Sequence, residues 1–303
     1  MANKKKMETY TPERFNEAEL VGTFESGTSE WHEARAEGIG GSDVGAILGL
    51  NKYESAFSLW SKKANILEAE PVDNWSVRFG KAFEMPLLEL FAEQYPELDI
   101  YTTGTYRHSN YKYMTANPDA LAYDKQSDSW IIVEIKTSRM SMSEWPESYK
   151  AQVNHYMDVL GIERAVIVGI SGWDYVEEWI DADAFVLAAQ RDAVTKFWER
   201  VTTGEAPDWD GADATYETIR KMHPAISDEE VEVSGGHELV LAKQDLERAK
   251  TKFNSARNEV MGLMADARYA YVEADGVKHY VAERRARGQG EPFLVVKNEG
   301  ERK

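Results

Sequence analysis

Residues 130–137 read Trp-Ile-Ile-Val-Glu-Ile-Lys-Thr, and the fold expected for the chain follows from this stretch. Its first four residues are apolar, a pattern typical of a central strand that is buried on both faces. Side chains alternate along a strand, so Glu134 and Lys136 share one face while Ile135 enters the core. Two charged side chains directly after such a run cost free energy unless they are paired or bind a ligand. The stretch therefore predicts a buried strand with a polar, functional end.

A second predicted strand, residues 112–123, precedes it and contains Asn-Pro-Asp at 117–119, and the polar residues 124–128 form a turn between the two. If the strands pair through this turn, Asp119 comes near Glu134. Two carboxylates and the backbone carbonyl of Ile135 then offer the hard oxygen ligands that Mg²⁺ prefers. Singly, each fragment also fits surface decoration, an acidic turn after proline or an exposed ion pair, but the buried run before Glu134 favours a site.

Such a site predicts phosphodiester hydrolysis. A bound Mg²⁺ polarises the scissile phosphate and lowers the pKa of the attacking water. Lys136 lies on the same strand face as Glu134, so its ammonium is placed to orient or deprotonate that water and to offset charge on the phosphorus. The residue types and their spacing thus indicate a magnesium-dependent nuclease.

The order of predicted elements indicates an α/β fold with a central mixed sheet flanked by helices. A long helix at 77–95 precedes the two strands, and the residues before it include a helix at 29–37 and a short helix that ends before Gly49. The other predicted elements are a strand at 101–107, a helix at 142–160, strands at 165–170 and 175–180, and a helix at 184–203. Residues 1–204 are therefore expected to form one domain.

Two further segments follow this domain. Residues 205–238 carry ten acidic residues against two basic ones and predict an acidic linker. Residues 239–303 predict a helix with a heptad repeat, a β-hairpin that turns at Asp275-Gly276, and a third strand at 293–296. The heptad positions are Leu239, Ala242, Leu246, Ala249, Phe253, Ala256, Val260, Leu263 and Ala267. This helix is expected to contact another part of the chain, a subunit or a partner.

The composition restricts the class of protein. The 303 residues include no Cys, which excludes disulfides, Cys-zinc sites and thiol nucleophiles and suits a reducing cytoplasm. No apolar run is long enough to span a membrane, and no signal peptide is expected. The net charge of −18 disfavours non-specific coating of duplex DNA, so any DNA contact is expected in a local groove.

Five motifs in order resemble one nuclease family. They read Gly-Ile-Gly-Gly-Ser-Asp-Val-Gly-Ala-Ile-Leu-Gly-Leu-Asn-Lys-Tyr at 38–53, Phe-Gly-Lys-Ala-Phe-Glu at 79–84, Asn-Pro-Asp at 117–119, Glu-Ile-Lys-Thr at 134–137 and Gln-Val-Asn-His-Tyr at 152–156. Together they resemble the YqaJ-type viral recombinase branch of the PD-(D/E)xK nuclease superfamily, which includes lambda exonuclease. The resemblance covers roughly residues 28 to 170 and implies a restriction-endonuclease-like core.

The resemblance also implies a role for each matching residue. Asp119, Glu134 and the Ile135 carbonyl would be the metal ligands, and Lys136 the catalytic lysine. Glu84 would be a further acidic residue near the metal. Gln152 and Tyr156 match a Gln-x-x-x-Tyr feature and lie four apart, hence on one helix face, where Gln152 could hold the water or a phosphate. Without the resemblance, Glu84 is an exposed helix acid, and Gln152 and Tyr156 pack on the sheet.

A second site is expected around residues 40–42, Gly-Gly-Ser. Glycine lets a backbone approach a ligand closely, and Ser42 is placed as the N-cap of the following helix, whose free N–H groups attract an anion. The resemblance implies that Arg35 and Ser42 bind a DNA phosphate, the terminal 5′-phosphate of the strand that is degraded. A plain capped turn is the alternative, and Asp43, expected at the first helical position, would interact with the helix dipole.

The leading hypothesis is a Mg²⁺-dependent exonuclease, with Mn²⁺ as a substitute, that degrades one strand of a double-stranded DNA end, 5′ to 3′ by resemblance. The resemblance further implies a phage or prophage protein, a single-strand annealing protein as partner, and a homo-oligomer that could be a ring. An endonuclease on the same fold and a non-catalytic DNA-end binder are the alternatives. The complete set of Glu84, Asp119, Glu134 and Lys136 argues against the last of these.

Overall fold

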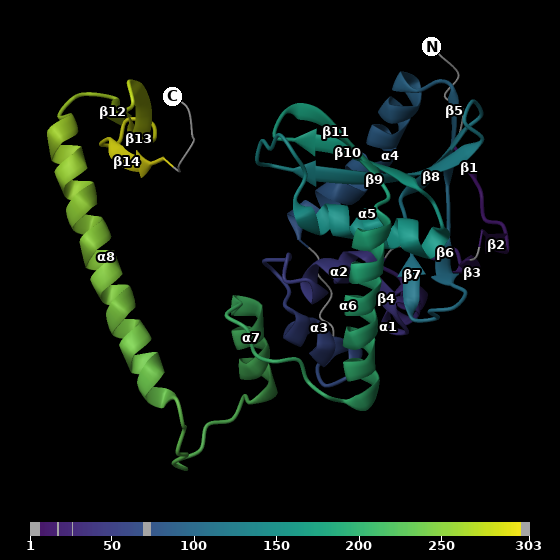
Figure 1. The fold of residues 1–303 in the computed structure, drawn as a ribbon, viewed down its shortest axis with the longest axis horizontal. Helices are drawn as coiled ribbons and strands as arrows, with labels where there is room; N and C mark the ends of the chain where they lie inside the picture. Colours follow the sequence, from purple (N-terminus) through teal and green to yellow (C-terminus); the bar gives the residue numbers. More distant parts are fainter. Residues whose placement is uncertain (1–6, 17, 26, 69–73, 298–303) are drawn as a thin grey trace. The chain divides into compact units, whose positions relative to one another are not determined.

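The computed structural model of the chain describes residues 7–16, 18–25, 27–68 and 74–297. It divides into two compact units, residues 1–226 and 227–303, and each is described by itself. Figure 1 shows the helices and strands of both units in chain order.

The first unit is built on a mixed sheet of six described strands in the order β1-β5-β8-β9-β10-β11. Their bounds are β1 Glu8–Thr9, β5 Leu98–Thr102, β8 Ala120–Asp124, β9 Ser129–Ser138, β10 Arg164–Ser171 and β11 Asp174–Asp181. β9 pairs in parallel with β10 and antiparallel with β8, where Ala120 lies opposite Val133 and Asp124 opposite Ser129. The predicted pairing of these two strands through the 124–128 turn is confirmed.

Helices cover both faces of this sheet (Figure 1), as the α/β prediction requires. α4 (Trp75–Gln94) covers one face, where Leu87 and Phe91 pack with Val133 and Ile135. α5 (Glu147–Leu160) and α6 (Ala184–Thr203) lie on the other side, in the core that contains Ile132. β9 is therefore buried on both faces, which is the physical reason for its continuous apolar run.

A second sheet in the first unit has the order β2-β3-β6-β7-β4. Its bounds are β2 Arg14–Phe15, β3 Ala18–Gly22, β6 Thr105–His108, β7 Met114–Ala116 and β4 Ile39–Gly40. Residues 101–107 and 112–123 are thus each divided between two sheets, where the sequence predicted one strand apiece. The chain changes sheet at Gly104, whose Cβ would lie 2.8 Å from the Gly22 carbonyl oxygen, and again at 117–119, where Pro118 has no N–H to donate.

Three helix starts differ from the prediction or add to it. α1 (Ser29–Ala36) is confirmed, but α2 (Gly41–Ile47) begins one residue before Ser42, with Gly40 at its N-cap. α5 begins at Glu147 rather than 142 because Pro146 disfavours helical geometry in the residue before it. α3 (Ala56–Lys63) was not predicted.

The expected acidic linker contains another helix, α7 (Asp213–Met222). It packs against α3, and the buried Thr215 hydroxyl lies 2.7 Å from the Ser55 hydroxyl at the N-cap of α3. The first unit therefore extends past the expected boundary at 204, to residue 226. Composition pointed to a linker because residues 205–238 are acidic as a whole, although most of these acids lie outside α7, whose buried residues are Thr215 and Thr218.

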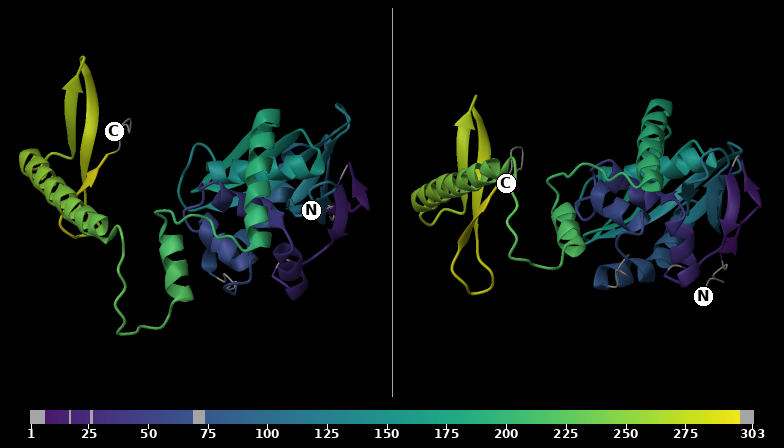
Figure 2. Two further views of the ribbon diagram at one scale, coloured as in Figure 1. Left: turned by 60° about the horizontal axis from the view of Figure 1, so that its bottom comes forward. Right: turned by 90° about the horizontal axis from the view of Figure 1, so that it is seen from below.

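The second unit contains the predicted heptad helix, hairpin and third strand (Figure 2). α8 spans Gly236–Met264, and β12 (Tyr269–Ala274), β13 (Val277–Arg285) and β14 (Phe293–Val296) form an antiparallel sheet. Asp275 and Gly276 both have positive φ, as the tight turn between β12 and β13 requires. In the described part of the chain, no helix combines the length and apolar composition needed to cross a membrane.

Candidate functional site

Asp119 and Glu134 meet where β8 begins and β9 approaches its carboxyl end. Asp119 immediately precedes β8, and one of its carboxylate oxygens accepts a 2.7 Å hydrogen bond from the Ile135 backbone N–H. Because Ala120 lies opposite Val133, the register places Asp119 across from Glu134. The proximity expected from the sequence is therefore present.

Glu134 is the centre of the polar network. Its Oε1 accepts hydrogen bonds from Lys136 Nζ at 2.7 Å and from Gln152 Nε2 at 2.6 Å. The residue is 3% exposed, and its Oε2 has no hydrogen-bond partner among the residues that the structure describes. A buried carboxylate oxygen without a partner is costly, so this oxygen is available to a cation or a hydrogen-bond donor.

Lys136 shares the Glu134 face of β9, as alternation predicts, and its ammonium also lies over the Tyr149 ring, 4.9 Å from the centroid. Burial would lower the pKa of Lys136, but the nearby Glu134 and Asp119 carboxylates outweigh it and raise that pKa. Lys136 is therefore a cation at neutral pH in the metal-free protein, and in that state it neutralises charge instead of accepting a proton.

Two of the acidic residues, Asp119 and Glu84, have raised pKa values. Burial raises the pKa of Asp119 well above its usual range, and Glu134 and Glu84 raise it further. Burial and Glu134 likewise raise the pKa of Glu84, a half-buried residue of α4. Glu84, Asp119, Glu134 and Lys136 thus form one electrostatically coupled site, contributed by α4 and the β8–β9 pair.

The site fits a divalent cation that keeps several of its waters. Among the described residues, no three acidic or histidine side chains converge tightly enough to form a complete metal cage. Asp119, Glu134 and the Ile135 carbonyl nevertheless supply hard oxygen donors, and the unpartnered Glu134 Oε2 is a free ligand position. A cation would also relieve the repulsion that raises the carboxyl pKa values. Two carboxylates with water and phosphate oxygens is the ligand set Mg²⁺ usually takes.

Gln152 and Tyr156 extend the network along one face of α5. Gln152 Nε2, bonded to Glu134, also lies 3.0 Å from the Tyr156 hydroxyl. Both side chains are buried, and burial together with Glu134 raises the pKa of Tyr156 well above its usual range, so the phenol stays protonated. The spacing of four residues predicted this shared face.

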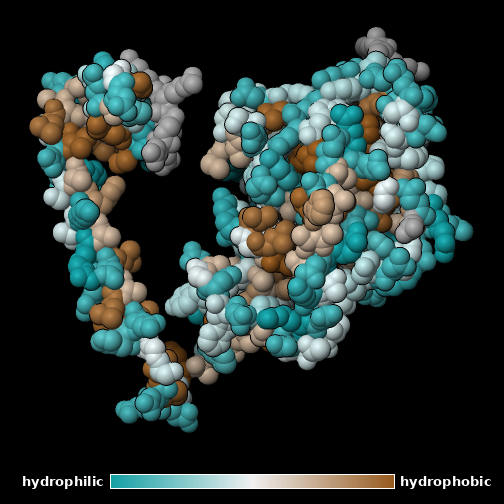
Figure 3. All heavy atoms as spheres, viewed as in Figure 1, coloured by the Kyte–Doolittle hydropathy of each residue, from teal (hydrophilic) through white to brown (hydrophobic). Residues whose placement is uncertain are grey.

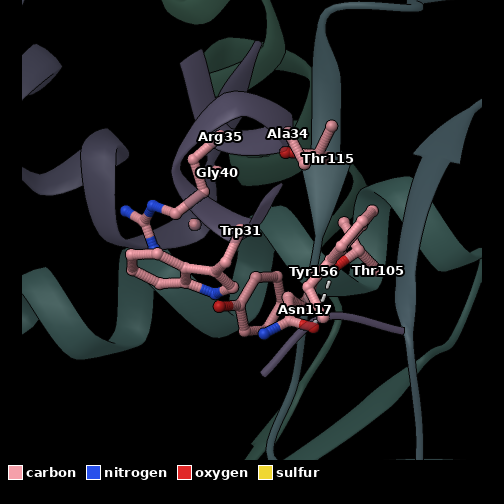
Figure 4. Close-up of a pocket in the computed structure, with 10 residues that line it drawn as sticks. Trp31, Ala34, Arg35, Gly40, Thr105, Thr115, Asn117 and Tyr156 are labelled. Carbon is pink, nitrogen blue, oxygen red and sulfur yellow. Dashed lines mark hydrogen bonds between the residues drawn. The ribbon is translucent and has the colours of Figure 1, made fainter. Parts of the chain in front are cut away.

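A pocket lies at the far end of this network (Figure 4), and Tyr156 is part of its wall. Arg35 is its charged residue, with the guanidinium 4.6 Å from the centre of the Trp31 ring and 2.6 Å from the Ser42 hydroxyl, to which it donates. The lining residues are Phe24, Trp31, Ala34, Arg35, Gly40, Gly41, Thr105, Thr115, Asn117 and Tyr156. The structure therefore brings Arg35 and Ser42 together, and Tyr156 and Gln152 connect the pocket that Arg35 lines to Glu134.

Gly41 permits this connection. A Cβ at residue 41 would lie 2.6 Å from Tyr156 Cε1 and 2.9 Å from Gln152 Cγ, closer than side chains tolerate. The start of α2 can therefore approach α5 only with glycine at this position. The close approach that the sequence predicted is to the protein's own α5.

The predictions that Ser42 is the N-cap of α2 and that Asp43 holds its first position are wrong. Asp43 is at the third helical position, and its carboxylate accepts a 3.1 Å hydrogen bond from the backbone N–H of the N-cap residue Gly40. The Asp43 side chain therefore caps the start of α2. Burial would raise the pKa of Asp43, but Lys63 at 2.9 Å and Arg35 at 3.4 Å outweigh it and lower that pKa. Asp43 thus has a structural role.

Some residues of the site gave little or no sequence signal. Lys63 lies on the unpredicted α3 and donates to the Arg35 and Gly38 carbonyl oxygens as well as pairing with Asp43. Gly169 on β10 faces β9 so closely that a Cβ would lie 1.7 Å from the Lys136 carbonyl oxygen. Parallel pairing of β9 with β10 is a long-range feature, so no local pattern marks this glycine.

Two buried aromatic residues near the site, His155 and Trp145, have structural roles. Burial lowers the pKa of His155, whose Nε2 lies 3.1 Å from the Ile39 carbonyl and 3.2 Å from the Thr115 carbonyl, where it links β4 to β7. Trp145 is buried, and its indole N–H donates to the Ile167 carbonyl.

Comparison with known proteins finds similar sequences and similar structures. Residues 30–163 match the model of the YqaJ-like viral recombinase domain. The uncharacterized protein YqaJ of Bacillus subtilis (strain 168) is 28% identical over 271 residues, which cover 84% of this chain and 83% of that protein. Protein D345L of African swine fever virus is 36% identical over 123 residues, 36% of this chain and 32% of that protein, so the match is to about a third of its length.

Two solved structures are similar at low sequence identity. LHK-Exo, an alkaline exonuclease from Laribacter hongkongensis, has a TM-score of 0.49 at 16% identity and covers 65% of this chain and 100% of that chain. A phage-related exonuclease from Haemophilus somnus 129PT has a TM-score of 0.41 at 14% identity and covers 56% of this chain and 96% of that chain.

Proposed function

We propose that this chain is a DNA exonuclease that depends on a divalent metal ion, and the match of residues 30–163 to the model of the YqaJ-like viral recombinase domain supports the proposal. The observation that carries the proposal is Glu134, whose buried carboxylate is held on one oxygen by Lys136 and Gln152 while the other is unpartnered. Asp119 and Glu84 share its electrostatic field. Such a grouping destabilises the fold by itself, which is typical of a site built for a ligand.

Asp119, Glu134 and the Ile135 carbonyl would hold the metal ion, and Glu84 would add negative charge beside it. Magnesium, or manganese in its place, would polarise the scissile phosphate and lower the pKa of a bound water. Lys136, a cation in the metal-free protein, is placed to stabilise negative charge on the phosphate oxygens in the transition state. Gln152 keeps Glu134 in position, because its amide spans the distance from that carboxylate to Tyr156.

The Arg35 pocket would hold the end of the substrate strand. A guanidinium offers planar pairs of donors that suit a phosphate, and Ser42 adds a hydroxyl next to it. Trp31 stacks on the guanidinium and fixes its plane. An end phosphate in this pocket would select a duplex end with a 5′-phosphate, which corresponds to 5′ to 3′ degradation.

The single strand left behind would be the substrate of a single-strand annealing protein in phage-type recombination. A ring-shaped homo-oligomer would keep the enzyme on its DNA.

Digestion of an end-labelled linear duplex tests the proposal. The substrate carries either a 5′-phosphate or a 5′-hydroxyl, and each is incubated in Mg²⁺ and in chelator beside a closed circular duplex. We expect mononucleotides from the phosphorylated linear duplex in Mg²⁺, and no product in chelator. Rapid cutting of the circle would instead indicate an endonuclease, and binding of ends without any cleavage would indicate a non-catalytic module.

Arg35→Ala separates the pocket from the catalytic site. It should slow digestion of the 5′-phosphorylated end by roughly tenfold or more, because a charge-assisted hydrogen bond pair is lost, and should change the 5′-hydroxyl substrate much less. Arg14→Ala is the matched control, since Arg14 is an exposed residue that pairs with Glu19 on the second sheet. Equal slowing of both substrates by Arg35→Ala would contradict a phosphate role for the pocket.

A further inference from the structure

The helix of the second unit presents an apolar stripe that its own unit leaves uncovered. Met264 is the one residue of α8 that is buried, whereas Leu239, Leu246 and Leu263 are 75%, 66% and 81% exposed. Figure 3 shows apolar side chains interrupting the hydrophilic surface of this helix at intervals. In heptad notation the a positions are Leu239, Leu246, Phe253 and Val260, and the d positions are Ala242, Ala249, Ala256 and Leu263. Four consecutive heptads of this kind need a partner helix.

The charges beside the stripe select the partner and its direction. The e positions are all basic up to the last heptad, namely Lys243, Lys250 and Arg257, whereas the g positions are Glu238, Asp245, Lys252 and Glu259. In a parallel pair of identical helices, each g residue faces the e residue of the next heptad on the other helix. Glu238 then meets Lys243, and Asp245 meets Lys250, which are attractive pairs.

One contact in the parallel arrangement, Lys252 with Arg257, is repulsive, and Glu259 meets the uncharged Met264. An antiparallel pair places e positions opposite e positions and g opposite g. It would gather the basic residues along one side and most of the acidic residues along the other. Charge complementarity therefore favours two copies of α8 running in the same direction and in register.

The core residues favour two helices over a wider bundle. Three of the four d positions are alanine, whose single side-chain carbon lets two helices approach closely. In a bundle of three or more, alanine layers would leave unfilled space, which protein cores do not tolerate well. We infer that α8 pairs with the α8 of a second copy of this chain as a parallel, two-stranded coiled coil. This interface is independent of the catalytic site and of the proposed nuclease activity.

The absence of cysteine from the chain makes a direct test available. Ala242→Cys and Ala256→Cys each place one thiol at a d position away from the middle of the helix. In a parallel pair the same residue of both copies faces itself, within the Cα separation of about 4.4–6.8 Å that a disulfide spans. Under mild oxidation, each variant of the full chain should give a covalent dimer. Gln244→Cys and Asn258→Cys, at the outward f positions, are the matched controls and should crosslink far more slowly.

A different pairing gives a different pattern. Antiparallel helices would join Ala242→Cys to Val260→Cys in a mixture of the two chains, with no self-crosslinking of either, and this would overturn the inference. Crosslinking of the f-position controls at the same rate as the d-position variants would overturn it as well. So would the absence of any crosslink, which would mean that α8 packs on its own chain or remains single.

Charge exchange tests the same interface without cysteine. Asp245→Lys turns the attractive contact with Lys250 into a repulsive one on both sides of the pair, and should weaken dimerisation roughly tenfold. Adding Lys250→Asp should restore it. By light scattering, the wild-type oligomer should contain an even number of chains, and Asp245→Lys should halve that number at suitable dilution. An odd number of copies, or a double variant no better than Asp245→Lys, would contradict a two-stranded pair.

Discussion

Replacement of Lys136 by methionine removes the ammonium that contacts Glu134 and keeps the length of the side chain. Glu134 is 3% exposed and would retain Gln152 as its remaining hydrogen-bond donor. Lys136 also lowers the pKa values of Asp119 and Glu84, so these carboxyl groups lose a stabilising neighbour too. The substitution therefore leaves a buried acidic cluster with less compensation.

Loss of one partner from a buried ion pair costs about 3–5 kcal/mol, and we take about 3 kcal/mol because the Lys136 side chain is 18% exposed. For a unit of this size, each kcal/mol shifts the melting temperature by about 2–4 °C, so the expected fall is about 6–12 °C. The pKa of Lys136 is raised in the folded state, so its stabilisation is complete below the unfolded pKa of 10.5 and is lost only as pH rises through the folded pKa. The fall should therefore be full at pH 8. It should be smaller at pH 5 for a separate reason: the pKa values of Asp119 and Glu84 are raised, so these carboxyl groups begin to protonate as the pH falls and then interact less with the ammonium.

Tryptophan fluorescence reports this unit selectively, because all nine Trp residues precede residue 227. Melting is followed in chelator at pH 8 and pH 5, and cleavage of the 5′-phosphorylated duplex is measured in Mg²⁺, where the loss should be at least about 100-fold. Lys196→Met is the control, since Lys196 is exposed on α6 and pairs with Asp192. A wild-type melting temperature at pH 8 together with unchanged cleavage would refute the coupled site.

Two further variants test neighbouring features. Asp119→Asn keeps an acceptor for the Ile135 N–H and removes a carboxylate whose raised pKa makes the metal-free fold less stable as pH rises above 3.8. The substitution should abolish cleavage yet raise the melting temperature in chelator, more at pH 8 than at pH 5. A lower melting temperature at pH 8 would contradict the direction of the pKa shift. Gly169→Ala places a Cβ 1.7 Å from the Lys136 carbonyl oxygen, so it should lower both the melting temperature and cleavage, whereas Gly211→Ala, which meets nothing within 4 Å, should change neither. Wild-type behaviour of Gly169→Ala would show that β9 and β10 do not approach as closely as described.

The sequence specified the features whose causes are local. Alternation along β9 puts Glu134 and Lys136 on one face of the strand. The short turn at 124–128 joins β8 to β9 and sets their register, so Asp119 lies beside Glu134. Helical spacing likewise put Gln152 and Tyr156 on one face of α5. The heptad of α8 and the Asp275-Gly276 turn are equally local, and both are present in the structure.

Only the tertiary structure decided what those faces meet. The chain from Glu134 through Gln152 and Tyr156 to the Arg35 pocket joins β9, α5 and α1, and no spacing in the sequence encodes such a contact. The same holds for Lys63, which compensates Asp43 across 20 residues, and for the packing of α7 on α3. Local patterns arise from backbone geometry that repeats every two or 3.6 residues, whereas these contacts arise from the way separate elements fill one core. The sequence by itself therefore determined the paired strands and the acidic site at their end, and the tertiary packing decided that buried hydrogen bonds link this site to the wall of a pocket with an arginine.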